Sequence, residues 1–298
     1  MNLFQDKEIT ILRSKVGGID NNLKSKIQEI NEKEIKLVVH PGNAGDALIY
    51  WSVYDIFNQC GISFETLYIP CSDLIENRIE TTFLLGGNFS NLYDSEPYLI
   101  SLLQKSEELV ILPSTFDHFP NFVKALRPND QVFCRDKESF DRIKELKPVC
   151  KLNLSPDTAM SITTPRNLEI RQLIKVSNFS FSELRRIFYL LYHFVRSQFK
   201  SELSSLRTDL EGEKLKYGFR NKMSDLSLLG NTSKNSPEVT ILFAQTLLFI
   251  VSKYRNIRTD RLHVAIASLI MGVENLQILD TPRKKLSNVF QLFLESRD

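Results

Sequence analysis

Short apolar runs alternate with helix-like segments through the first half of this sequence, and this alternation constrains the fold more than any other feature. Ile35 to Val39 stops before His40-Pro41-Gly42, and Asp46 to Gln59 then carries apolar residues at the spacing of a helix face. Further strand-like runs, separated by helix-like stretches, are Phe64 to Ile69, Thr82 to Leu85, Leu109 to Leu112 and Gln131 to Cys134. Runs this short, bounded by Gly and Pro, are typical of buried parallel strands. The pattern predicts an α/β fold with a mostly parallel sheet between helices.

Polar clusters follow these predicted strands at the point where each strand ends. They are His40 to Asp46, Gly86 to Asn91, Pro113 to His118, and Arg135-Asp136. The carboxyl ends of parallel strands meet at one edge of a sheet, which is where α/β proteins bind ligands. We therefore expect these clusters to build a single site.

Length and composition set broad bounds on the function. With 298 residues, 42% hydrophobic residues and 25% charged residues, the chain fits two medium α/β domains or one large one in an ordinary soluble protein. A formal net charge of +2 gives no case for a nucleic-acid partner, which would require strong basic clustering. The N-terminus lacks a secretory pattern, and the longest apolar run, Ile241 to Val251, is too short to span a bilayer.

The cysteines and histidines show no pattern that predicts a metal site. Cys60, Cys71, Cys134 and Cys150 include no CxxC pair, and the four histidines are scattered. Free cysteines in a reducing cytoplasm are the simpler interpretation. We therefore expect a cytoplasmic protein without a bound metal.

A basic amphipathic helix is predicted from Phe181 to Lys200. Its apolar face carries Leu184, Phe188, Leu191, Val195 and Phe199, and its charged positions are Arg185, Arg186, Arg196 and Lys200. Two interpretations are open. The helix packs between domains, which is the usual role of an apolar stripe and the one we favour. Alternatively, it lies on an anionic membrane surface at the inner face, as a peripheral contact.

A final α/β unit is predicted near the C-terminus, after a loop at residues 218–237. It consists of a helix, a strand, the TDRLH loop (Thr259 to His263), a second helix and a second strand, and a last helix follows it. Its elements are Pro237 to Lys253, Arg255 to Ile257, Val264 to Met271, Leu276 to Leu279, and Leu286 to Glu295.

Two glycine-containing loops are candidate ligand-binding segments. In Gly42-Asn43-Ala44-Gly45-Asp46, the glycines allow a ligand to approach the main chain, and the following helix would favour an anion. Gly86-Gly87-Asn88 has the same character. Neither loop is a dinucleotide or phosphate-loop motif, and both also fit purely structural turns.

Charged residues at two other strand ends have competing interpretations. Arg135 can provide a guanidinium fork for phosphate or carboxylate. Alternatively, Asp136 caps the next helix and Arg135 pairs with it. Ser155-Pro156-Asp157 is equally ambiguous, and a turn is its simplest interpretation.

The TDRLH loop is the richest of these groups. It places Arg261 and His263 together where the chain leaves a strand, so the pair can bind an oxyanion and move a proton near neutral pH. The competing interpretation is a capped turn in which Asp260 caps the following helix.

Taken in order, seven segments resemble the polysaccharide pyruvyl transferase family. They are PGNAGDALI (Pro41 to Ile49), LLGGNFSNLY (Leu84 to Tyr93), ILPSTF (Ile111 to Phe116), FCRDKESF (Phe133 to Phe140), LSPDTAM (Leu154 to Met160), SLRTDLE (Ser205 to Glu211) and TDRLHVAIASLIMGV (Thr259 to Val273). Together they extend the resemblance from about residue 37 to residue 290.

The resemblance implies a fold like that of GT-B glycosyltransferases, with two Rossmann-like domains facing a cleft. We place these domains at residues 1–165 and 166–298. It also implies transfer of a pyruvyl group from phosphoenolpyruvate to a sugar of a cell-surface or exopolysaccharide, giving a pyruvate ketal. Phosphoenolpyruvate is then the donor substrate, a free or lipid-linked glycan is the acceptor, and no cofactor is needed.

The resemblance also implies roles for single residues. His263 and Asp46 become the catalytic pair, and Arg261 and Arg135 become anion clamps for the donor. Substrate binding extends to Asn43, Gly42, Gly87, Asn88 and Asp260.

The chain departs from the family pattern at two positions. Ser114 stands where many members have glutamine, and Val264 stands where glycine often follows TDRLH. Two alternatives to pyruvyl transfer therefore stay open. One is a GT-B-like glycosyltransferase that uses a nucleotide sugar, and the other is a catalytically degenerate member that binds glycans.

Overall fold

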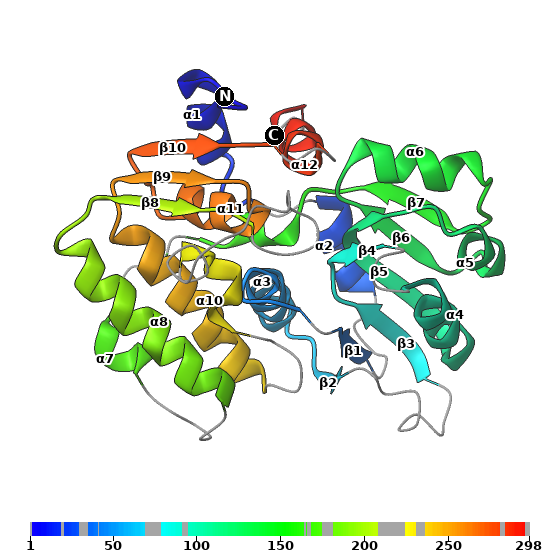
Figure 1. Ribbon diagram of the computed structural model, residues 1–298. Coiled ribbons are helices and arrows are strands. Elements are labelled where there is room, and N and C mark those ends of the chain that lie inside the picture. The colour runs from blue at the N-terminus through cyan, green and yellow to red at the C-terminus, as the bar shows by residue number, and fades with distance from the viewer. Residues whose placement is uncertain are drawn as a thin grey trace.

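The structure is a computed structural model of the chain, and its helices and strands are arranged as two α/β halves (Figure 1). It describes residues 2–18, 21–29, 35–40, 42–68, 79–90, 95–163, 165, 168–174, 181–207, 224–230, 236–280 and 284–295.

The first half contains a sheet whose neighbouring strands all run parallel, in the order β2-β1-β3-β5-β6-β7, with β4 paired to β5. The strand bounds are β1 Ile35–Val39, β2 Phe64–Tyr68, β3 Ile79–Leu84, β4 Asn88–Phe89, β5 Ser106–Phe116, β6 Gln131–Cys134 and β7 Lys151–Leu154. The predicted parallel sheet is confirmed. β1 and β6 have the predicted bounds because their apolar side chains are buried on both faces.

Strand β5 does not end at Pro113, as the sequence suggested, but continues to Phe116. The prediction was wrong because the strand pairing is irregular at Pro113 and therefore accommodates the proline. The pairing of β5 with β6 shifts register between Ile111 and Ser114, so the ladder does not need an N–H group from Pro113. The extension matters for the site, because it carries Ser114 and Thr115 beyond the predicted strand end.

Helices cover this sheet as the alternation predicted. Their bounds are α2 Asn21–Glu29, α3 Asp46–Gln59, α4 Ser95–Lys105, α5 Pro120–Ala125 and α6 Lys137–Glu145. α3 has the predicted bounds, and α6 begins after Asp136, whose carboxylate accepts a hydrogen bond from the Ser139 amide at 2.8 Å.

The second half contains a smaller parallel sheet in the order β10-β9-β8. Its strands are β8 Glu202–Ser205, β9 Asn256–Thr259 and β10 Asn275–Ile278. The helices of this half are α7 Ile170–Leu173, α8 Phe181–Ser197, α10 Pro237–Ser252, α11 Leu262–Ile270 and α12 Lys285–Glu295, together with the 3-10 helix η3 Leu226–Leu229. The predicted 218–237 loop lies mostly outside the described residues, which include η3 with its flanks (224–230) and the start of α10 (236–237).

The two ends of the chain tie the halves together. Helix α1 (Asp6–Ser14) lies against α11 and α12 of the second half, and the Leu3 amide donates to the Ile278 carbonyl at 2.7 Å. Helix α12 in turn reaches α6 of the first half, where Asn288 donates to Glu138 at 2.7 Å. The two sheets lie on either side of residue 165, while the domain boundary itself stays a prediction.

Helix α8 corrects our preferred interpretation of the basic amphipathic segment. Its predicted apolar face points to solvent, and the buried residues are Glu183, Arg186, Tyr189, Leu190 and His193. The interpretation as a packed apolar stripe was therefore wrong. Among the described residues, no helix combines the length and apolar character needed to cross a membrane.

Candidate functional site

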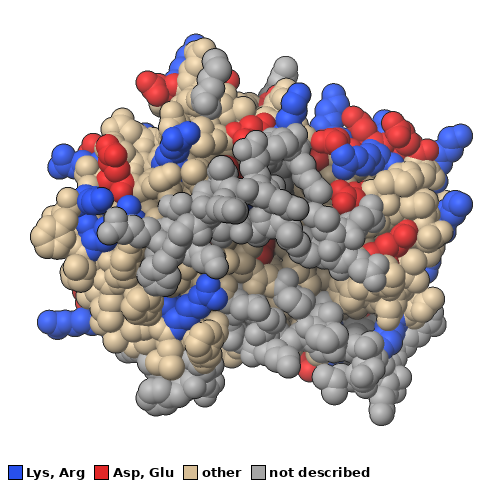
Figure 2. Space-filling view, in the orientation of Figure 1, with Lys and Arg blue, Asp and Glu red and all other residues tan. Residues whose placement is uncertain are grey.

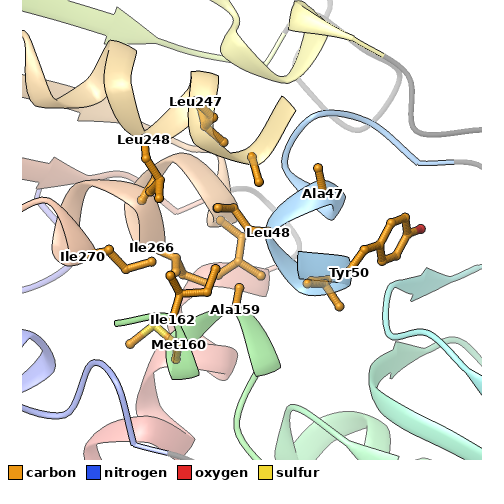
Figure 3. Packing of buried hydrophobic residues seen from close by; sticks show 14 of the residues in the cluster. Ala47, Leu48, Tyr50, Ala159, Met160, Ile162, Leu247, Leu248, Ile266 and Ile270 are labelled. Carbon is orange, nitrogen blue, oxygen red and sulfur yellow. The ribbon is translucent and has the colours of Figure 1, made fainter. Parts of the chain in front are cut away.

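Three segments that are distant in sequence meet at one buried apolar cluster. They are the first turn of α3, the 3-10 helix η2 (Thr158–Ser161) and α11. Leu48 of α3 lies among Ala159 of η2, Ile266 of α11 and Leu248 of α10 (Figure 3). Each of the three segments also carries one polar residue of the candidate site, namely Asp46, Asp157 or His263. Their shared core therefore fixes the backbones that hold these side chains together.

The loop before α3 is closed by its own side chains. The Asn43 amide donates to Asp46 Oδ2 at 2.8 Å, and the Gly45 amide donates to Asn43 Oδ1 at 2.7 Å. Gly42 lies against the Asp46 side chain. A Cβ atom on Gly45 would lie 2.7 Å from His263 Nδ1, so glycine is what lets this loop approach the imidazole ring. The loop therefore orients Asp46 toward His263 and uses its own amides in doing so.

A series of neighbouring ionisable side chains connects the first half of the protein to His263 of the second half. Arg135 Nη1 donates to Asp157 Oδ2 at 2.7 Å, and both side chains are buried. His263 Nε2 lies 3.7 Å from the same oxygen of Asp157, and His263 Nδ1 lies 3.8 Å from Asp46 Oδ1. The imidazole is therefore placed between two carboxylates and keeps 11% of its side chain exposed.

The ionisation of Asp157 follows from its neighbours. Burial by itself raises the pKa of Asp157, but the Arg135 guanidinium and then His263 outweigh burial, so the pKa lies well below its ordinary range. The Ala159 amide also donates to Asp157 Oδ1 at 3.0 Å, in the same direction. Asp157 thus stays an anion, and its carboxylate faces His263 Nε2 at 3.7 Å.

Arg135 is held on its other side by the extended strand β5. Its Nε atom donates to Thr115 Oγ1 at 3.0 Å, and Thr115 donates to Asp136 at 2.9 Å. Asp136 caps α6, so that part of the alternative interpretation was right, but Arg135 pairs with Asp157 rather than with Asp136.

The Gly87-Asn88 segment reaches Arg135 through Thr115. The Thr115 amide donates to the Gly87 carbonyl at 3.0 Å, and Asn88 is the register partner of Thr115. A Cβ atom on Gly87 would lie 2.2 Å from His40 Nε2, so a larger residue has no room there. Ser114 is fully buried and bonds to the main chain, donating to the Leu112 carbonyl at 2.6 Å and accepting from the Gly87 amide at 3.3 Å. Ser114 thus connects β5 to the segment that directly precedes β4.

Arg261 and Asp260 form a second polar group next to the first. Arg261 Nε donates to Asp225 Oδ1 at 3.0 Å, and both side chains are buried. Asp260 accepts from the Arg207 amide at 2.8 Å and does not cap α11, so that interpretation of the loop was wrong. Burial raises the pKa of Asp260, although the Arg207 amide and the nearby guanidinium groups of Arg261 and Arg207 oppose this effect.

The structure brings most of the predicted site residues into two adjoining groups. Asp46, Asn43, Gly42, His263 and Arg135 belong to the first, which Gly87 and Asn88 join through Thr115, while Arg261 and Asp260 belong to the second. The Ala44 amide links the groups, because it approaches the Ser227 carbonyl of η3 at 3.4 Å.

Sequence reasoning missed the role of two aspartates. The LSPDTAM segment leaves the role of Asp157 ambiguous, with a turn as the simplest interpretation, and Asp225 lies in a predicted loop without any signal of its own. The roles of Arg135 and Arg261 as anion clamps stay predictions, because in this structure each guanidinium is paired with a buried carboxylate. Within the described ranges, no three His, Cys, Asp or Glu side chains are grouped so that they could hold a metal ion.

Comparison with known proteins identifies the family of this chain. The family model for polysaccharide pyruvyl transferase matches residues 43–276, and the chain therefore belongs to that family. Its family name denotes the transfer of a pyruvyl group to polysaccharide.

Two individual proteins are similar over most of the chain. The Bacillus subtilis (strain 168) protein named "Putative pyruvyl transferase EpsO" is 22% identical over 289 residues, which are 85% of this chain and 83% of that protein. A crystal structure of an uncharacterized protein from Klebsiella pneumoniae subsp. pneumoniae NTUH-K2044 matches with a TM-score of 0.68 at 19% identity, covering 93% of this chain and 94% of that one. The structural likeness supports the two-domain α/β fold.

Proposed function

We propose that this protein transfers the pyruvyl group of phosphoenolpyruvate onto two hydroxyls of one sugar in a cell-surface or exopolysaccharide, forming a cyclic ketal. The observation that carries the proposal is the position of His263, between Asp46 and the buried Arg135–Asp157 pair. Family membership supports pyruvyl transfer in general, and the geometry supports a proton-transfer site beside an anion site.

His263 is the proposed acid. Histidine has an ordinary pKa nearest to neutrality, so it can exchange a proton under physiological conditions. Protonation of the methylene carbon of phosphoenolpyruvate forms a C–H bond and leaves a cationic centre at the enol carbon, which a sugar hydroxyl attacks. The C–O bond to phosphate then breaks, phosphate leaves with its electron pair, and a second hydroxyl closes the ketal. The two hydroxyl protons pass to bases, and we propose Asp46 as one of them.

The donor's negative charge requires complementary groups close to His263. Helix α11 begins at this site without a side chain that caps its first turn, so its amide groups and the positive end of its dipole favour an anion. We propose that the donor phosphate binds there, with the Arg261 guanidinium shared between the phosphate and Asp225. In the absence of the donor, Arg261 and Asp225 balance each other's charge.

Two measurements distinguish the proposed roles of His263 and Arg261: binding of phosphoenolpyruvate, and phosphate release in the presence of a glycan acceptor. Phosphoenolpyruvate is expected to raise the melting temperature of the protein, whereas nucleotide sugars leave it unchanged. His263→Gln should keep this thermal shift but lose at least about 100-fold in phosphate release with a glycan acceptor, within the usual range for a general acid. Arg261→Gln leaves Asp225 without its partner and should lower stability, and in the folded protein it should mainly raise the KM for phosphoenolpyruvate.

A control variant and two results that would contradict the proposal complete the test. His118→Gln changes an exposed histidine beyond the end of β5, which belongs to neither of the two groups of site residues although the sequence placed it in a candidate cluster, and it should behave as the unmodified protein. A thermal shift with a nucleotide sugar but not with phosphoenolpyruvate would instead support a glycosyltransferase. Full phosphate release by His263→Gln would exclude the proposed acid.

A further inference from the structure

The outward face of α8 and the turn that follows it form an exposed apolar stripe. It consists of Phe181, Leu184, Phe188, Leu191, Val195 and Phe199. Phe181 and Phe199, at its two ends, are 82% and 83% exposed. These residues recur every three or four positions, so they share one side of the helix. They are six of the nine large hydrophobic side chains that are exposed in the described part of the chain, and this concentration distinguishes the stripe from scattered surface residues.

Polar contacts on the inner face of α8 hold the stripe outward. The Arg186 guanidinium donates from Nη1 to Thr246 Oγ1 at 3.3 Å and to the Leu173 carbonyl. His193 Nδ1 lies 2.8 Å from the Tyr254 hydroxyl. Rotating the helix to bury the stripe would break these contacts and expose their partners to an apolar face. The packing of the inner face therefore keeps the apolar stripe on the protein surface.

The charges beside the stripe are positive. Arg185 and Arg196 are separated by about three helical turns, so both lie along the same side of the stripe, and exposed Lys200 follows its end. Glu183, the acidic residue of α8, is buried on the inner face. Figure 2 shows Lys and Arg side chains next to a surface without Lys, Arg, Asp or Glu at the left of the molecule, where α8 lies. The surface of this helix thus combines exposed aromatic side chains with cations.

We propose that the outward face of α8 binds an anionic bilayer surface, with the helix axis lying in the plane of the membrane. Apolar side chains flanked by Lys and Arg are the pattern by which helices insert into the interfacial region of anionic membranes. Phe181 and Phe199 are strongly exposed and lie about 27 Å apart along the helix axis. In this orientation they anchor both ends of the helix at the same depth in the membrane.

Charge argues against a second copy of this chain as the partner of the stripe. Antiparallel pairing of two such helices would bring Arg185 of one copy near Arg196 of the other, and α8 offers no exposed acidic residue to offset the repulsion. An anionic surface removes this repulsion and attracts each cation by about 1 kcal/mol.

Vesicle sedimentation tests the proposal without any substrate, so its result is independent of the proposed reaction. The protein should bind vesicles that contain phosphatidylglycerol, bind phosphatidylcholine vesicles at least about tenfold more weakly, and be released by salt. Phe181→Ser with Phe199→Ser should weaken binding by about tenfold or more. Arg185→Gln with Lys200→Gln should weaken it similarly, at about fivefold per cation.

The control variant carries Ile11→Ser and Val149→Ser, which remove exposed apolar side chains elsewhere, and it should bind like the unmodified chain. Equal binding by the phenylalanine variant and the control would overturn the proposal, as would no binding to either vesicle. Concentration-dependent dimerisation that the phenylalanine substitutions abolish, without vesicle binding, would assign the stripe to a second copy.

Discussion

Asp157→Asn is the substitution whose effect follows most directly from the structure. The change keeps the size of the side chain but removes the negative charge that faces Arg135. The two side chains are 0% and 1% exposed, and their atoms are 2.7 Å apart. The substitution therefore leaves a guanidinium buried without its counter-charge, and Thr115 accepts only one of its hydrogen bonds.

Breaking a buried ion pair by removing one partner destabilises a protein by about 3–5 kcal/mol. For a domain of this size, a loss of that magnitude lowers the melting temperature by roughly 6–20 °C. Urea unfolding followed by circular dichroism and by tryptophan fluorescence measures the change, and agreement between the two probes shows whether one transition is being followed. Replacing both partners, as Arg135→Met with Asp157→Leu, should cost less than Asp157→Asn alone, because no unpaired charge is then buried.

Glu138→Gln provides the matched control, because Glu138 also pairs with an arginine, Arg142, but at the surface. Exposed pairs of this kind contribute about 0.3–0.5 kcal/mol. If Asp157→Asn were no less stable than Glu138→Gln, the Arg135–Asp157 pair would not be the buried, dominant interaction described above.

Other predictions concern acid stability, the loop–histidine contact and cysteine reactivity. The lowered pKa of Asp157 means that its contribution to stability is complete above about pH 4 and is lost as the pH falls further, so acid unfolding should have a shallower pH dependence in Asp157→Asn. Gly45→Ala should displace the His263 ring and lower kcat by about 100-fold in a phosphate-release assay, since the added Cβ atom has no room, and unchanged turnover would contradict the contact. Burial raises the pKa of Cys150 to about 11, so iodoacetamide should label it about a hundredfold more slowly in the folded protein than after unfolding, as peptide mass spectrometry can measure.

The strands and helices with the clearest apolar patterns were predictable from the sequence. β1 and α3 were predicted to the residue because one is buried on both faces and the other begins directly after a glycine loop. β8 was missed because its sequence, ELSS, has no apolar run, and pairing with β9 defines it as a strand. For α8 the sequence left two interpretations open, and the contacts of Arg186 and His193 decide which side is buried.

For the candidate site, the sequence indicated which residues are candidates better than it indicated which side chains they contact. Asp46 and His263 lie in the first turns of α3 and α11, which follow strands of the two different sheets, and the structure brings them to 3.8 Å. Arg135 pairs with Asp157 instead of Asp136, whose carboxylate accepts hydrogen bonds from the Ser139 amide and from Thr115. Arg261 likewise finds Asp225 through tertiary packing, which no local pattern encodes.

The most direct test of the proposed function follows both products of one reaction. The purified protein is incubated with phosphoenolpyruvate and a panel of free and lipid-linked glycans, and phosphate release is measured together with glycan mass. We predict that one glycan gains a single pyruvyl ketal for each phosphate released, and that His263→Gln abolishes both signals while His118→Gln retains them. Phosphate release without a change in glycan mass, or equal turnover by His263→Gln, would contradict the proposed reaction.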